Sequence, residues 1–184
     1  HRTSRRQRQM CIRDRDMPSA NRSSRRSGPR SGPTKLMNKL SFVLNIKTSN
    51  TAPQNGLFMN RFEEPDSVIQ SISHTPITRY NRSRQEHEEL SANELEKPGF
   101  HGDSMTMKSV WKDNSGVVVG TTKKTFKNAK GFFTIRQVAA NIVKFEIKDR
   151  PKSNWFGGID AHHVYFEGLH RNRQGDTYCV FWGS

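Results

Sequence analysis

The fold is decided by residues 131–184, which read GFFTIRQVAANIVKFEIKDRPKSNWFGGIDAHHVYFEGLHRNRQGDTYCVFWGS. Thr134 and Gln137 have the spacing of a capping box, in which each side chain satisfies a free backbone N–H at the start of a helix. Apolar residues then recur at intervals of three and four, as on one buried helix face. Pro151 ends the pattern because it cannot continue the helix. The stretch therefore predicts one amphipathic helix over residues 134–149.

Two pairs of strand-like runs flank this helix. All four runs are rich in aromatic and branched residues, and turn-forming residues separate the members of each pair. The pairs are residues 105–111 with 117–123 and residues 162–169 with 177–182. We therefore expect an α+β fold with the order β-β-α-β-β, in which the helix packs on a small, mainly antiparallel sheet.

The aromatic residues predict where the folded domain begins. Of the 17 Phe, Trp and Tyr residues, 13 lie at or after Phe100, so the earlier part of the chain has little material for a core. We expect four segments. They are a non-native leader at 1–16, a disordered basic arm at 17–62, an acidic linker with little core at 63–99, and a globular α+β domain at 100–184.

The net charge of +14 is concentrated near the N-terminus. Residues 1–16 carry +4 and residues 17–40 carry +6, whereas residues 63–97 carry −4. A basic arm without aromatic side chains offers phosphate contacts but no base stacking, so we expect nonspecific affinity for anions or nucleic acid. The acidic segment could also fold back on the arm. The candidate nucleic-acid contacts are Arg22, Arg25, Arg26 and Arg30 in the arm, and Lys123 and Lys124 in a second basic patch.

The N-terminal residues also bear on the start of the protein and its location. Residues 6–15 are typical of translated adaptor sequence, so we expect Met17 to be the start. Residues 17–62 contain no acid, as in transit peptides, but their prolines and glycines favour a disordered tail over an amphipathic helix. With two cysteines and no secretory feature, an intracellular location is expected, with transit to an organelle as the alternative. No apolar run approaches the roughly 20 residues that span a bilayer, so no membrane partner is expected.

The best candidates for chemistry lie in residues 160–167, which read DAHHVYFE. In an extended strand Asp160 and His162 share a face about 6.6 Å apart, so both could ligate one metal ion. His163 and Glu167 share the other face about 13 Å apart, which is too far for one ion but suits acid–base groups at opposite ends of a cleft. The structural alternative is that the imidazoles bond to the sheet or a loop.

No complete catalytic constellation emerges from the chain. We therefore expect a small intracellular, non-catalytic interaction module whose partner is a protein or a nucleic acid, and the residues identify no cofactor. One alternative is a metal-dependent hydrolase with Asp160 and His162 on the metal and His163 and Glu167 as catalytic groups. The other is a small viral capsid protein with a basic arm.

Overall fold

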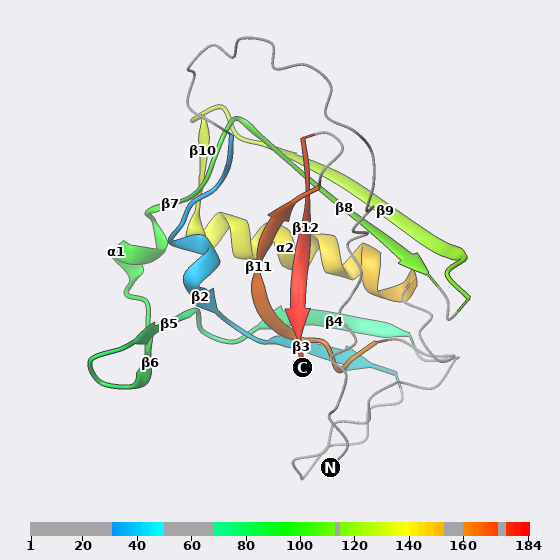
Figure 1. Ribbon diagram of the computed structural model, residues 1–184, viewed down its shortest axis with the longest axis horizontal. Helices are drawn as coiled ribbons and strands as arrows, with labels where there is room; N and C mark the ends of the chain where they lie inside the picture. The colour runs from blue at the N-terminus through cyan, green and yellow to red at the C-terminus, as the bar shows by residue number, and fades with distance from the viewer. Residues whose placement is uncertain (1–30, 50–67, 113–114, 153–159, 173–175) are drawn as a thin grey trace, which may run out of the picture.

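The computed structural model describes residues 31–49, 68–112, 115–152, 160–172 and 176–184 (Figure 1). These residues mix α and β structure but are mostly β, with 52% in strands and 20% in helices. The strands form several sheets. The predicted β-β-α-β-β fold with a single sheet is therefore wrong, because residues before 100 contribute strands of their own.

The largest sheet has four strands in the order β11-β12-β8-β9. Their bounds are β8 (Ser104–Lys112), β9 (Val118–Lys127), β11 (Tyr165–Arg171) and β12 (Thr177–Gly183). Both predicted hairpins are confirmed, since β8 pairs with β9 and β11 pairs with β12, each antiparallel. The two hairpins join through β12 and β8, which run parallel, with Thr177 opposite Thr106.

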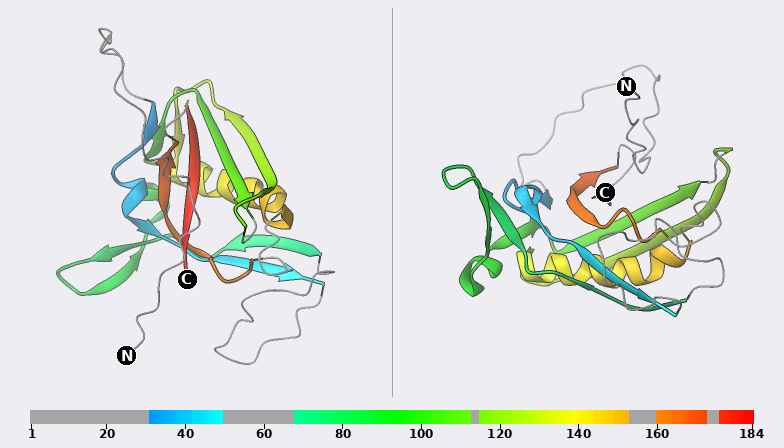
Figure 2. Two further views of the ribbon diagram at one scale, coloured as in Figure 1. Left: turned by 45° about the vertical axis from the view of Figure 1, so that its right-hand side comes forward. Right: turned by 90° about the horizontal axis from the view of Figure 1, so that it is seen from below.

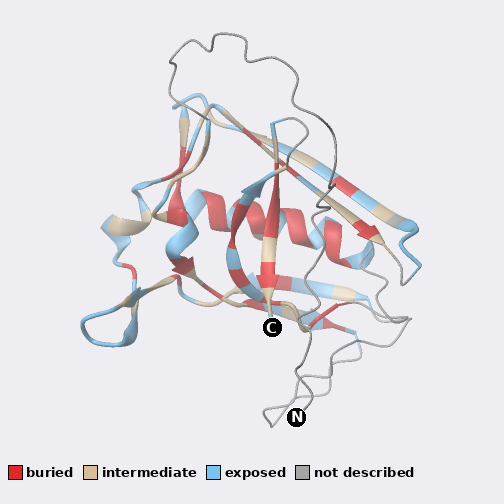
Figure 3. Ribbon diagram, in the orientation of Figure 1, coloured by how far each residue is buried: buried red, intermediate tan, exposed pale blue. Residues whose placement is uncertain are grey.

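The predicted helix is present as α2 (Ile135–Asp149), followed by the short 3-10 helix η2 (Arg150–Lys152). Its capping box forms as expected, because the Thr134 hydroxyl accepts from Gln137 N at 3.2 Å and Gln137 Oε1 accepts from Thr134 N at 3.0 Å. One face of α2 is buried (Figure 3). That face includes Ile135, Val138, Ala139, Ile142 and Phe145. No helix in the described ranges is long and apolar enough to cross a membrane.

Most of the remaining elements lie in the described residues between 32 and 101. They are β1 (Gly32–Pro33), η1 (Met37–Lys39), β2 (Leu40–Ser41), β3 (Leu44–Thr48), β4 (Ile69–His74), β5 (Thr78–Asn81), β6 (Glu86–Glu89), α1 (Ala92–Leu95) and β7 (Pro98–His101). The sheets they make are β1-β7-β10, with β10 (Phe132–Thr134), then β2-β5-β6, and the pair β3-β4. Helix α2 lies between the β8–β9 hairpin and the β3–β4 pair (Figures 1 and 2).

The early strands share the core with the later ones. Phe42 is buried and stacks on Phe166 of β11 with ring centroids 4.5 Å apart, and its edge meets Trp182 of β12 at 6.1 Å. Strands β4, β5 and β6 are mostly polar and their residues are mostly exposed or half-buried, so they lack the aromatic and branched runs that identified the later strands. The division of the chain at residues 16, 62 and 99 remains a prediction, and described residues on both sides of residue 99 belong to one core cluster.

Candidate functional site

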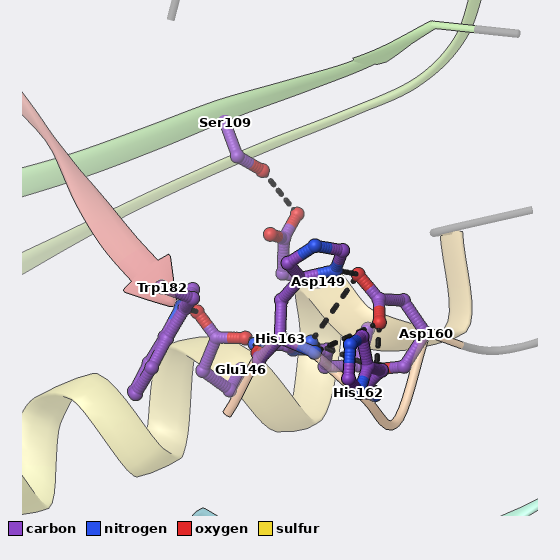
Figure 4. Close-up of polar contacts among 8 residues, drawn as sticks. Ser109, Glu146, Asp149, Asp160, His162, His163 and Trp182 are labelled. Atoms are coloured by element: carbon purple, nitrogen blue, oxygen red, sulfur yellow. Dashed lines mark hydrogen bonds and ion pairs between the residues drawn. The ribbon is translucent and has the colours of Figure 1, made fainter. Parts of the chain in front are cut away.

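The carboxylate of Asp160 is hydrogen-bonded to the segment that follows it in the chain. Its side chain is 1% exposed and lies just before β11. One carboxylate oxygen accepts the backbone N–H groups of His162 at 3.0 Å and His163 at 3.1 Å, and the other lies 2.8 Å from Nδ1 of His163 (Figure 4). These local bonds fix the turn that leads into the strand.

Arg150 joins the end of α2 to that turn. Its guanidinium is fully buried, with Nε donating to Glu146 at 2.5 Å and the two terminal nitrogens donating to the carbonyls of Asp160 at 2.8 Å and His163 at 2.7 Å. The planar guanidinium suits this role because its donors point in fixed directions. We call Glu146, Arg150, Asp160 and His163 the arginine clamp.

The pKa values of the two carboxylates in the arginine clamp, Glu146 and Asp160, are shifted in opposite directions. Burial raises the pKa of Glu146, although Arg150 and the indole N–H of Trp182, which donates at 3.0 Å, both favour its charged form. Burial would also raise the pKa of Asp160, but the hydrogen bond from His163 and the charge of Arg150 hold it below its ordinary value. Asp160 is therefore stabilised as a carboxylate by groups that belong to the fold.

Asp160, His162 and His163 of the predicted site lie next to one another, whereas Glu167 lies apart from them. Asp160 bonds to the backbone of His162, and the His162 ring packs edge-on against the His163 ring at 5.3 Å. Glu167 is exposed on β11 and lies against Gly183 of β12, whereas His163 is held by Asp160. In the described ranges no three His, Cys, Asp or Glu residues are placed to hold a metal ion.

Sequence reasoning missed Glu146 and Arg150. Their spacing of four residues is that of an ion pair on one helix face, and this spacing was the available signal. Arg150 directly precedes Pro151, where the helical pattern was expected to end, so the sequence did not show that its side chain turns inward. Burial of both residues depends on Trp182 and the turn at Asp160, which come later in the chain.

Lys123 and Lys124 belong to a larger basic surface. Lys123 is exposed on β9 directly opposite Lys108 of β8, and Lys127 lies on the same face. Lys124 points to the other face, where its ammonium donates to the carbonyl of Lys144 in α2 at 3.2 Å. Lys108, Lys123 and Lys127 therefore lie on one face of the hairpin, and Lys124 lies on the other face beside Lys144 and Lys148 of α2. We call these six residues together the lysine surface.

Positive charges accumulate on the lysine surface without compensation. None of its six side chains forms an ion pair with a carboxylate among the residues that the structure describes. Partial burial lowers the pKa of Lys124, and the charges of Lys148 and Lys144 lower it further. Like charges placed directly opposite, as in Lys108 and Lys123, destabilise a sheet. The arrangement therefore costs stability.

The four arginines of the arm, Arg22, Arg25, Arg26 and Arg30, lie outside the described residues. Of the predicted nucleic-acid contacts, Lys123 and Lys124 lie in the described part of the chain, and their side chains point to opposite faces of β9. No protein-family model, curated protein or solved structure matches the chain.

Proposed function

We propose that this chain is a small, non-catalytic interaction module that binds polyanions, nucleic acid among them, through the lysine surface. The observation that carries the proposal is a set of six lysines on adjoining elements without carboxylate partners in the described part of the chain. Such a surface gains free energy by displacing counterions from a phosphate chain. The basic arm adds nonspecific affinity.

The arginine clamp supports the non-catalytic part of the proposal. A general acid or base has to reach a substrate proton, but both oxygens of Asp160 are already bonded and the residue is 1% exposed. The ring of His163 is hydrogen-bonded to Asp160, and Glu167 lies further along the chain, on β11. This arrangement gives no support to a hydrolase that uses these residues.

The capsid alternative also gains no support from the arrangement of the sheets. A jelly roll consists of two sheets that face each other. In this protein α2 lies between the β8–β9 hairpin and the β3–β4 pair (Figure 2), and its apolar face belongs to the core cluster.

Binding of a fluorescently labelled oligonucleotide, followed by anisotropy at several salt concentrations, tests the proposal. The full chain should bind at low salt, and replacing both Lys123 and Lys124 with alanine should weaken binding and reduce the slope of log K against log salt by up to about 2. The matched control replaces Lys47 and Lys97, which are exposed elsewhere, and removes the same charge. Equal losses in both variants, or no binding at low salt, would exclude the lysine surface as the site.

A further inference from the structure

We propose that this chain associates head to tail with a second copy of itself, by pairing the outer edge of β9 in one copy with the outer edge of β6 in the next. Such pairing goes beyond the proposed function, because the partner is a protein and the contact joins two strands. Three features of the described residues support it, which are the direction of the backbone groups at the two edges, the charges beside them, and their places in the molecule.

Strand β9 is the last strand of the four-stranded sheet, so its outer side carries backbone groups that β8 does not bond. In an antiparallel pair every second residue directs its N–H and C=O toward the partner strand. Asn128 donates across the hairpin to the carbonyl of Asp103 at 2.8 Å, so the even-numbered residues of β9 face β8. The carbonyl of Thr121 accepts from the ammonium of Lys152 at 2.7 Å, as expected of an odd-numbered residue that faces outward.

The outward groups of β9 beyond this contact lie at Lys123, Thr125 and Lys127. All three residues are exposed, and no hydrogen bond joins their outward backbone groups to another residue that the structure describes. This part of β9 can therefore accept one more strand.

Strand β6 ends the sheet β2-β5-β6 in the same way. Leu90 donates to the carbonyl of Ile77 at 2.9 Å, so the even-numbered residues of β6 face β5. The backbone groups of His87 and Glu89 therefore point outward, and both residues are exposed. Each chain thus has two strand edges that can pair.

One antiparallel register brings opposite charges together at the two edges. Placing Lys123 opposite Glu89 sets the outward residues of both strands against each other, as hydrogen-bonded pairs require. The same register puts Lys124 opposite Glu88 on the other face of the joined sheet. Glu88 also contacts Arg84 at 3.2 Å, whereas Glu89 forms no ion pair within the described residues, so Lys123 and Glu89 supply most of the charge complementarity.

Charge also selects which edges pair. Two β9 edges would bring lysines against lysines, and two β6 edges would bring together Glu86, Glu88 and Glu89. Like charges directly opposite each other destabilise a sheet, and lysines on an edge strand oppose its pairing with an edge of the same kind. An acidic edge removes that repulsion, so β9 with β6 is the favoured combination.

The β5–β6 and β8–β9 hairpins lie on opposite sides of the molecule (Figures 1 and 2). One chain therefore cannot join its own β6 to its own β9, and the pairing has to use a second copy. Each copy keeps one edge for a further partner, so the contact repeats and produces rings or filaments.

Sedimentation velocity of the full chain at several protein concentrations tests the proposal. The sedimentation coefficient should rise with concentration. Lys123→Glu and Glu89→Lys each place like charges opposite one another, so each variant alone should associate at least about tenfold more weakly. The matched control is Lys47→Glu, an equal charge change at an exposed position on β3, which should associate like the unmodified chain.

An equimolar mixture of the Lys123→Glu and Glu89→Lys variants is the decisive sample. The unmodified β9 of one variant then meets the unmodified β6 of the other, and the two altered edges are again opposite in charge, so association should recover. A chain that stays monomeric at every concentration, undiminished association of Lys123→Glu, or no recovery in the mixture would each overturn the inference. A monomeric chain that binds a peptide with the sequence of residues 85–90 would also overturn it, since the β9 edge would then serve a different protein.

Discussion

Replacing Arg150 with methionine tests whether the residues around Asp160 hold the fold together. Methionine keeps much of the side-chain volume but removes every donor, so the Glu146 carboxylate, with its side chain 2% exposed, loses its counter-charge. The carbonyls of Asp160 and His163 lose their donors as well. Breaking a buried pair from one side costs about 3–5 kcal/mol. Each orphaned carbonyl costs about 1–3 kcal/mol before relaxation and water entry offset part of the loss. We expect the free energy of unfolding to fall by about 4 kcal/mol, roughly a thousandfold in the unfolding equilibrium.

Urea unfolding followed by tryptophan fluorescence measures this change, because Trp182 contacts both Glu146 and Arg150. The control is Arg171→Met, which removes an exposed ion pair with Asp176 and should change the stability far less, because water and salt screen such a pair. Adding Glu146→Gln to Arg150→Met should recover part of the loss, since a neutral amide needs no counter-charge. An effect of Arg150→Met no larger than that of Arg171→Met would refute the structural role of the arginine clamp.

Three further predictions concern the core, the pH dependence and the histidines. Phe42→Ala should lower the free energy of unfolding by about 3–5 kcal/mol in urea titrations, whereas Tyr80→Ala, at an exposed position, should change it by about 0.5 kcal/mol or less. The lowered pKa of Asp160 means that its stabilising effect is present above its unfolded pKa of about 3.9 and disappears as the pH falls through its folded pKa. The stability difference between the unmodified protein and Asp160→Asn should therefore shrink between about pH 5 and pH 2 in acid titrations, and a constant difference would contradict the assignment. His163→Ala leaves an oxygen of Asp160 without its ring partner and should lower the Tm more than His162→Ala does, while Zn²⁺ or Mn²⁺ should leave the Tm of the unmodified protein unchanged. A metal-dependent rise that both substitutions remove would restore the metal-site hypothesis.

The elements that sequence reasoning predicted are those encoded by neighbouring residues. Thr134 and Gln137 satisfy each other's backbone groups across one turn, so the start of α2 could be identified without tertiary structure. The β8–β9 and β11–β12 hairpins likewise follow from turn-forming residues between two runs of strand formers. Even the basic character of Lys123 and Lys124 could be read from the chain, although not the residues that surround them.

The candidate site was less predictable because its contacts join distant residues. The residue types at Asp160 and His163 suggested chemistry, but whether a carboxylate serves a substrate or the fold depends on what fills its hydrogen bonds. Arg150 and the turn at Asp160 supply those bonds only after α2 and β11 have packed together. A pattern of residue types along one strand contains no information about that packing.

Local hydrogen bonding and apolar periodicity thus defined the helix and the hairpins, because these signals act over a few residues. Tertiary structure alone decided the number of sheets, the place of Phe42 in the core and the gathering of lysines from β8, β9 and α2. The physical reason is that burial and electrostatic interactions depend on distance in space, and residues far apart along the chain become neighbours only when the chain has folded.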